Sequence, residues 1–412
     1  MRILQIVHCY YPSVGGAQTL ARVIAEKMAA KGHEIRILTS AMDPKGGYLS
    51  FKETRMPLRE TLNGIEINRH YGATIWYECG RWTEKNFPKN RFKAWILWQF
   101  TKLVRQHFKH KISGMIHDFK PDIILLTAAT YSHSSIFMDA YREKPFPYIV
   151  IPALHGTEAR SSSREVGERL QKAAAVLVFT NYEAELVKKI HGVPHKNIFV
   201  AGLGSDLPDK SQEVTDRQPW ILCFGRRMQH KGMDILFEAM KLVWKSRPDA
   251  KLVFAGSNPY HQPWVSSVDK EFQDRLLTYD NISDIEKGKL FDSACCLAFS
   301  SKSESFGLVL LEAWKCRLPV IAWDIPPMKE IISEAVDGFL IPLDNISVLA
   351  EKILFYLNHP DAAQSMGEAG YQKTAQKYQW NNFIHTLEKA CHFCLSFNKN
   401  ASSGKLDRKS QF

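Results

Sequence analysis

The stretch RILQIVHCYYPSVGGAQTLARVIAEKMAAKGHEIRILTS, residues 2–40, places an apolar run on either side of a glycine loop and an amphipathic segment. The runs at residues 2–9 and 34–40 are typical of buried strands, and residues 19–33 are typical of a helix that Gly32 closes. Because a strand, a helix and a second strand in this order form a right-handed crossover, the two strands are predicted to be parallel. The stretch therefore predicts an α/β fold.

The same alternation runs through most of the chain and restarts once. In the first half, further strands are predicted at residues 122–128, 148–156, 175–181 and 197–203. After the polar linker 202–219 the pattern begins again, with a helix at 232–248 and strands at 220–226, 250–256 and 295–301. We therefore expect two Rossmann-like, doubly wound parallel-sheet domains facing a cleft, with ligands at the carboxyl ends of the strands.

The length of the chain predicts two domains, and its composition predicts a cytoplasmic location. The chain has 412 residues, 45% of them hydrophobic, and a single core stops growing near ~250–300 residues. No run of 18 apolar residues occurs and the first residues lack the features of a signal peptide, so we expect a cytoplasmic protein. Eight scattered cysteines indicate reduced thiols, and Cys391 and Cys394 have the spacing of half a zinc site without a second pair.

The net positive charge is confined to the N-terminal half. Residues 1–206 hold 29 Lys and Arg against 18 Asp and Glu, whereas residues 207–412 hold 25 of each, so we expect the halves to face different partners. Residues 75–112 interleave aromatic and basic side chains, which suits an anionic membrane surface and a peripheral location on the inner face of the membrane. A soluble helix with its aromatic rings in the core gives the same pattern, and both interpretations stay open. No nucleic-acid recognition motif accompanies the charge.

A second stretch, SKSESFGLVLLEAWKCRLPVIAWD at residues 301–324, carries two carboxylates around a predicted helix start. Residues 308–314 favour a helix, so Glu304 lies in the loop before it and Glu312 lies on it. The helix would direct its free amides and positive dipole end at an anion. Glu312 would follow Gly307 by about 7–8 Å along the helix axis, comparable to the distance from the phosphates of a nucleotide to its ribose hydroxyls.

Two further signals point to a diphosphate. The glycines at residues 15–16, between the first strand and its helix, would let backbone amides approach an anion. Arg226 and Lys231 leave the first strand of the second domain, where their charges can be shared between two linked phosphates. Ribose, diphosphate and a hydroxylated group near Glu304, in that order, form a nucleotide sugar. No Asp-x-Asp pair occurs in the sequence, which fits a site that needs no metal.

The ordered combination of motifs resembles the retaining glycosyltransferases of family 4 (glycosyl transferases group 1), which have GT-B architecture. ESFGLVLLEAW at residues 304–314 is similar to their Glu-x7-Glu signature. The resemblance extends over most of the chain, through YYPSVGGAQ, LHG, GLGSD, FGRRMQHKGMD, LVFAGSNP, PVIAWD and DGFLIP. It implies an acceptor-binding domain at residues 1–206 and a nucleotide-sugar-binding domain at 207–376. A helix at 377–397 would cross back to the first domain, and residues 398–412 are expected to form a disordered tail.

The resemblance also implies roles for the site residues. Glu312 would hold the ribose and Glu304 the transferred sugar, and His155 would lie beside that sugar near the reacting carbon. Diphosphate binding would fall to the glycine of the first domain, the two cations and the start of the helix, namely Gly16, Arg226, Lys231, Phe306, Gly307 and Leu308. Relatives lead us to expect retention of anomeric configuration with no metal or other cofactor.

The acceptor and the donor identity stay open. A lipid-linked or saccharide acceptor of glycolipid or polysaccharide synthesis is expected on the basic domain. The alternatives are a non-catalytic nucleotide-sugar-binding partner, or a sugar-nucleotide epimerase or phosphorylase of the same fold. Base-reading residues are expected between residues 256 and 284. Departures from the family pattern at Ser305, Arg317 and Pro326-Pro327 leave the diphosphate site intact and affect the expected donor sugar.

Overall fold

The computed structural model describes residues 1–13, 15–41, 56–70, 91–156, 159–207, 217–227, 231–257 and 268–402. It gives the backbone alone at residues 91–101, 104, 132, 159–160 and 397–402. Several predicted segments therefore lie partly outside the described residues: the start of the aromatic and basic segment (75–90), most of the linker (208–216), part of the base-reading segment (258–267) and the last residues of the tail (403–412).

The first sheet has eight strands in the order β3-β4-β2-β1-β5-β6-β7-β8. Its strands are β1 (Arg2–Ile6), β2 (Glu34–Ser40), β3 (Arg59–Leu62), β4 (Ile65–His70), β5 (Ile123–Thr127), β6 (Tyr148–Ile151), β7 (Ala175–Val178) and β8 (Ile198–Val200). Its helices are α1 (Gly16–Ala30), α3 (Arg91–Phe119), α4 (Ser132–Glu143), α5 (Arg164–Gln171) and α6 (Asn181–His191), with short 3-10 turns at Ala159–Ser162 and His195–Asn197.

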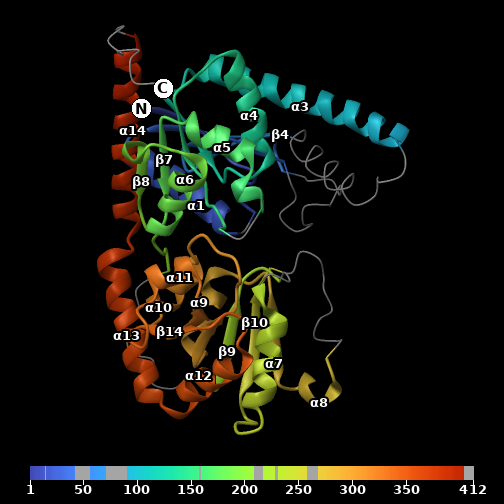
Figure 1. The fold of residues 1–412 in the computed structure, drawn as a ribbon, viewed down its shortest axis with the longest axis vertical. Coiled ribbons are helices and arrows are strands. Elements are labelled where there is room, and N and C mark those ends of the chain that lie inside the picture. Colours follow the sequence, from blue (N-terminus) through green and yellow to red (C-terminus); the bar gives the residue numbers. More distant parts are fainter. Residues whose placement is uncertain are drawn as a thin grey trace.

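The second sheet has six strands, all parallel, in the order β11-β10-β9-β12-β13-β14. These are β9 (Trp220–Phe224), β10 (Lys251–Gly256), β11 (Leu276–Asp280), β12 (Cys296–Phe299), β13 (Val320–Trp323) and β14 (Gly338–Ile341). The helices are α7 (Met233–Val243), α8 (Lys270–Gln273), α9 (Asp284–Ser293), α10 (Leu308–Lys315), α11 (Pro326–Ile331), α12 (Ile346–Asn358) and α13 (Pro360–Lys377). Two parallel-sheet α/β units stacked along the long axis confirm the predicted fold class (Figure 1).

One strand of the first sheet is antiparallel to its neighbour. β3 pairs antiparallel with β4 at the edge of the first sheet. The two strands are joined by Asn63 and Gly64, which have φ angles of 52° and 78°. Positive φ at both residues is the requirement of a tight hairpin turn, and an Asn-Gly pair adopts it readily. The sequence analysis predicted neither β3 nor β4, so this hairpin is an addition to the predicted parallel-sheet domain.

The central strands of the first sheet are buried on both faces. Ile3, Ile123 and Leu125 contribute to one apolar cluster, whereas the alternating residues Leu4 and Ile124 contribute to the other. This alternation follows from the two-residue period of a strand. Helices α3 and α4 cover the second face, and α1 covers the first. Because the helices cover the two faces, loops at the carboxyl ends of the strands are the part of the sheet that can reach a ligand.

The last helix, α14 (Trp380–Ser402), leaves the second domain and packs on the first sheet against β6, β7 and β8 (Figure 1). Phe383 and Leu387 are buried there, and Lys31 Nζ at the end of α1 lies 2.7 Å from Glu388 Oε2. The helix continues past Asn398, where the sequence predicts the tail to begin. Residues 398–402 contain no proline or glycine, and Gly404 is the first residue that strongly disfavours a helix.

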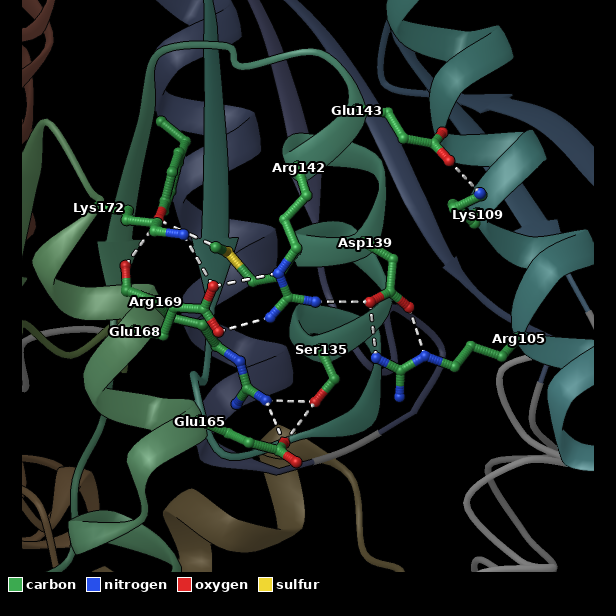
Figure 2. Close-up of polar contacts among 12 residues, drawn as sticks. Arg105, Lys109, Ser135, Asp139, Arg142, Glu143, Glu165, Glu168, Arg169 and Lys172 are labelled. Carbon is green, nitrogen blue, oxygen red and sulfur yellow. Dashed lines mark hydrogen bonds and ion pairs between the residues drawn. The ribbon is translucent and has the colours of Figure 1, made fainter. Parts of the chain in front are cut away.

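Ion pairs join α3, α4 and α5 on the first domain, as Figure 2 shows. The pairs link α3 to α4 and α4 to α5: Arg105 with Asp139, Lys109 with Glu143, and Arg142 with Glu168. Two of the cations in the aromatic and basic segment 75–112 thus have carboxylate partners on the protein itself. Within the described ranges, none of the helices combines the length and apolar content that crossing a membrane requires.

Candidate functional site

In each sheet the direction of strand progression reverses once, between β1 and β5 and between β9 and β12. Loops that leave neighbouring strands on opposite sides of such a point diverge, and the space between them is where open α/β sheets bind ligands. The loop after β9 carries Arg226 and Lys231, and the loop after β12 carries Glu304. The residues singled out in the second domain therefore meet at its switch point.

The backbone of Lys231 is fixed by contacts with the loop that follows β12. Ser300, the residue after β12, donates a hydrogen bond from Oγ to the Lys231 carbonyl at 2.7 Å. The next residue, Gly232, has a φ of 67°, and a Cβ built on it would lie 2.2 Å from the Ser300 carbonyl oxygen. Only glycine fits this close approach of two loops, which brings Lys231 to the start of α7 beside β12.

Lys231 and Glu304 form an ion pair. The Glu304 side chain is only 11% exposed. Burial is the largest single effect and would raise the pKa of Glu304, but the charge and hydrogen bond of Lys231, together with Ser301 and His155, hold that pKa below its ordinary value. Glu304 is therefore a buried carboxylate at neutral pH, and its lysine partner lies where a negatively charged ligand would also be attracted.

The N-terminus of α10 faces the first domain. Gly307 is its N-cap with a φ of 88°, and no side chain caps the helix. A Cβ built on Gly16 would lie 3.9 Å from Leu308 Cδ1, and one built on Gly15 would lie 2.9 Å from Arg226 Nη2. The first residues of α1 and α10 thus approach each other with Arg226 beside them. Two helix N-termini and a guanidinium at one place form an anion-binding environment.

Phe306 anchors this junction. It is buried, and its ring lies 6.1 Å from Phe179 at the end of β7 and 5.7 Å from Tyr378 after α13. A Cβ built on Gly202 would lie 2.8 Å from Tyr378, so the connecting segment is packed tightly against the same ring. The start of α10 is therefore fixed to the first domain by aromatic packing, which leaves its backbone amides in a defined position.

Glu312 lies on α10 beyond this junction and contacts Lys287 of α9, with Oε1 2.8 Å from Nζ. Its side chain is 19% exposed. Burial raises the pKa of Glu312, Asp284 and Asp206 add to the rise, and Lys287 offsets part of it. The carboxylate is thus turned inward, between α9 and α10. Sequence reasoning missed Lys287, because a lysine on another helix, 25 residues before Glu312, gives no signal of its own.

His155 reaches the second domain from the loop after β6. Its Nδ1 lies 3.3 Å from Ser303 Oγ, and its backbone N–H donates to Ser161 Oγ at 3.2 Å. Ser303 directly precedes Glu304, so the structure brings His155 and Glu304 to the same place from opposite domains. Ser303 is a second residue of the site that the motif alone does not indicate.

Three stacked rings follow β1 and β5 at the switch point of the first sheet. His8 lies 4.5 Å from Tyr131 and 5.9 Å from His133, measured between ring centroids. Burial, with the nearby Arg226 charge adding, lowers the pKa of His8 to about 3, and burial lowers the pKa of His133 well below its ordinary value. This part of the first domain therefore presents neutral aromatic rings next to the cations of the second.

Together these side chains form a polar series across the domain junction. His155 and Glu304 lie at one end, Lys231 follows, and Glu312 lies at the other end on α10. Carboxylates at both ends can accept hydrogen bonds from hydroxyl groups, and the cations and helix N-termini between them suit phosphate oxygens. The chemistry matches a ligand with hydroxyl groups on both sides of a diphosphate.

Two family descriptions match consecutive parts of the chain. "Glycosyltransferase Family 4" matches residues 14–207, and "Glycosyl transferases group 1" matches residues 206–373. Together they cover residues 14–373, which contain every strand except β1 and all the site residues predicted from the sequence.

Individual relatives are more distant. The alpha-D-kanosaminyltransferase of Streptomyces kanamyceticus is 22% identical over 87% of this chain and 95% of its own. A GDP-mannose-dependent monoacylated alpha-(1-6)-phosphatidylinositol monomannoside mannosyltransferase of Corynebacterium glutamicum is 30% identical over 42% of this chain and 46% of its own. The structure of Anabaena HepE in complex with UDP-glucose has a TM-score of 0.69 at 16% identity, covering 96% of this chain and all of that one (100%).

Proposed function

The chain belongs to glycosyltransferase family 4 and is a sugar-transferring enzyme, and from this premise we propose which bonds it makes and breaks and with which residues. The donor is a nucleotide-diphosphate sugar that lies across the domain junction. The acceptor is a saccharide or a lipid-linked sugar bound by the first domain. Transfer proceeds with retention of anomeric configuration and without a metal ion. The Lys231–Glu304 pair beside the N-terminus of α10 is the observation that carries the proposal.

The diphosphate lies at the cations and helix N-termini. Arg226 and Lys231 bind its oxygens, and the backbone of Phe306, Gly307 and Leu308 donates hydrogen bonds from the start of α10. Gly16 lets α1 approach from the first domain. When the bond between the anomeric carbon and the phosphate oxygen breaks, negative charge develops on the leaving diphosphate, and these groups stabilise it without having to reorganise. This electrostatic role is one that a divalent cation fills in other transferases.

The acceptor hydroxyl attacks the anomeric carbon from the face that the diphosphate leaves. The new carbon–oxygen bond forms as the old one breaks, and the hydroxyl proton passes to the departing phosphate oxygen. No side-chain base is needed for this proton. Glu304 accepts hydrogen bonds from the transferred sugar, and its negative charge stabilises the positive charge that develops on the sugar ring in the transition state.

Glu312 and His155 hold the two ends of the donor. Glu312 accepts hydrogen bonds from the ribose hydroxyls, for which its inward-turned carboxylate is suited. His155, hydrogen-bonded to Ser303, lies beside the sugar and orients one of its hydroxyl groups. The relative that acts with GDP-mannose and the HepE complex with UDP-glucose both support a nucleotide-sugar donor. The relative whose name includes phosphatidylinositol supports a lipid-linked acceptor.

The first experiment identifies the donor. Ligand-induced thermal shifts with UDP, GDP and ADP select the nucleotide, and the matching radiolabelled sugars with a membrane extract test transfer. We expect nucleotide release and a labelled acceptor, with no loss of rate in EDTA. Binding without release would favour a non-catalytic nucleotide-sugar-binding protein, and a rate lost in EDTA would contradict metal independence.

Substitution of the two carboxylates tests the roles of the site residues. Glu304→Gln should reduce transfer by at least about 100-fold and leave nucleotide affinity within about twofold, since it acts on the sugar in the transition state. Glu312→Gln should weaken nucleotide binding itself. Glu351→Gln, an exposed glutamate on α12, is the matched control and should behave like wild type. Wild-type behaviour of both site variants would refute the residue assignments.

A further inference from the structure

Glu183 is a buried acid directly behind His155. It is the third residue of α6 and is 1% exposed. Its own N–H donates to the N-cap oxygen, Thr180 Oγ1, at 3.1 Å. In a capping box a glutamate at this position would turn back to the amide of the N-cap residue. The Glu183 carboxylate instead accepts hydrogen bonds from two other amides, Leu154 N–H at 2.7 Å and Phe179 N–H at 2.9 Å.

These two amides belong to adjacent strand ends. Phe179 directly follows β7, and Leu154 lies in the loop after β6, immediately before His155. Within that loop Ala153 has a φ of 51°, a left-handed conformation that a non-glycine residue keeps only when its surroundings hold it. The Glu183 carboxylate therefore links the His155 loop to the end of the neighbouring strand β7 through one hydrogen bond to each.

The same helical turn restrains the other side of the loop. A Cβ built on Gly156 would lie 2.2 Å from the hydroxyl oxygen of Tyr182, so the tyrosine fills the space beside the residue after His155. Both neighbours of His155 in the chain are thus restrained: Glu183 binds the amide of Leu154, and Tyr182 packs beside Gly156. Its imidazole Nδ1 still reaches Ser303 of the second domain. The loop is fixed on the first domain, and its side chain acts across the junction.

A buried carboxylate is a costly way to hold a loop. Burial raises the pKa of Glu183 to about 7, and the two backbone N–H donors only partly counter this effect. A carboxylate can accept at both oxygens, but a glutamine of the same shape can accept at only one and must direct its NH₂ at a second donor. The ionised side chain is therefore specifically suited to holding two amides at once.

We propose that Glu183 is a positioning residue of the transfer reaction: by binding the Leu154 amide it sets the backbone from which His155 reaches the transferred sugar. The inference rests on the proposed function, because His155 has work to do only if a donor sugar lies beside it. Glu183 does not touch the donor, so its removal should lower turnover and leave nucleotide binding unchanged.

The test uses the full chain and whichever of the UDP-, GDP- or ADP-sugars the wild type turns over. Glu183→Gln should lower kcat at least about tenfold, with KM for the donor and the affinity for the free nucleotide within about twofold of wild type. Glu185→Gln is the matched control, because Glu185 lies on the same helix, exposed and paired with Lys188 and Lys189, and it should leave kcat unchanged. Glu183→Asp keeps the charge and should restore part of the rate, which also gives a readout if the glutamine variant does not fold.

Two further readouts separate positioning from a general loss of packing. In a His155→Ala background, Glu183→Gln should lower kcat further by less than about twofold, since both changes remove the same contribution of His155 to kcat. The wild-type kcat should fall as the pH drops from 8 to 6 with an apparent pKa near 7, and the glutamine variant should lack this step.

Each failure has its own meaning. Equal loss of rate from Glu183→Gln in the wild-type and His155→Ala backgrounds, or a wild-type kcat in the variant, would overturn the inference and leave the proposed function standing. A wild-type chain that turns over none of the donors would overturn the proposed function and the inference with it.

Discussion

Glu304 and Glu312 are both buried acids with a lysine partner, yet their pKa values move in opposite directions. The difference comes from their other neighbours. Glu304 has Lys231 and the nearby His155, which favour the carboxylate. Glu312 has Lys287, but Asp284 and Asp206 add negative charge close by. Glu312 is therefore the acid whose ionisation depends on a single lysine.

Lys287→Met should make nucleotide binding sensitive to pH. Glu312 already has a raised pKa, and without Lys287 that pKa rises further, so the variant loses the Glu312 carboxylate at a higher pH than the wild type does. A protonated Glu312 accepts hydrogen bonds from the ribose less well. As the pH is lowered from about 9 to 6, we therefore expect nucleotide affinity to fall at a higher pH in the variant than in the wild type.

Isothermal titration of the nucleotide across this pH range measures the effect. Lys289→Met, an exposed lysine two residues along α9, is the matched control and should follow the wild-type profile. An affinity of the Lys287 variant that is low but constant with pH would show that Lys287 binds the ligand directly and does not act through Glu312.

At the scale of elements, the helices and strands with strong patterns were predictable, and the contacts between them were not. β2 has the predicted bounds, Glu34–Ser40, and α10 is one residue longer than predicted. Glu304 and Glu312 could be singled out because they flank one helix start. Lys287 and Glu183 could not, because each meets its partner only after separate elements pack. The β3–β4 hairpin had a local signal, Asn63-Gly64, that would have indicated the antiparallel edge.

Gly307 tests the start of α10 as an element. Its φ of 88° is unfavourable for any other residue, and a Cβ would lie 3.3 Å from both Leu310 Cδ1 and Phe299 Cε1. Gly307→Ala should therefore lower the free energy of unfolding by about 1–2 kcal/mol. Because the change displaces the first amides of α10, it should also weaken nucleotide binding.

Chemical denaturation and nucleotide titration check the two effects. Gly114→Ala on α3 is the control, since a Cβ there meets nothing within 4 Å and the residue is inside a helix. It should raise the free energy of unfolding by about 0.5–1 kcal/mol and leave nucleotide affinity unchanged. Full nucleotide affinity in the Gly307 variant would exclude the α10 amides from the diphosphate site.

At the scale of the whole molecule, a side chain of the second domain caps a helix of the first. Glu330 on α11 accepts hydrogen bonds from the Asn181 N–H at 2.8 Å and the Asn181 Nδ2 at 3.1 Å, and from the Tyr182 N–H. A carboxylate is favoured at the N-terminus of a helix, both by the free amides and by the dipole. The turn that holds the His155 loop, which Thr180 already caps within the first domain, thus gains this second cap only while the domains are together.

Glu330→Ala should loosen the domain arrangement. Loss of the cap removes an interaction worth about 0.5–2 kcal/mol between the domains, so we expect a larger radius of gyration in small-angle scattering and a lower kcat. Nucleotide affinity should change little, because the diphosphate groups lie on other elements. Glu351→Ala is the control for charge and residue type. An unchanged radius and kcat would show that other contacts suffice to hold the domains.

The membrane contact predicted from residues 75–112 stays a prediction, and it too belongs to the scale of the whole molecule. Arg105 and Lys109 of α3 pair with α4, as Figure 2 shows, so charge available for lipids must come from other residues of the segment 75–112. Lys111 is exposed on the same helix. We propose that Lys111→Glu weakens sedimentation with anionic liposomes at low salt, whereas Lys245→Glu, the same charge change on the second domain, does not. Equal sedimentation with neutral vesicles would exclude the electrostatic attachment.

The path of α14 bears on the order in which the protein is made. Phe393 lies 5.6 Å from Phe199 of β8, and Cys391 and Cys394 are buried on the same helix against a sheet whose strands all precede residue 201. During translation this sheet emerges long before its cover does. The part of its apolar face that α14 covers must stay open, or be shielded by a chaperone, until α14 leaves the ribosome. Maturation of the first domain is thereby delayed until the second domain has been synthesised.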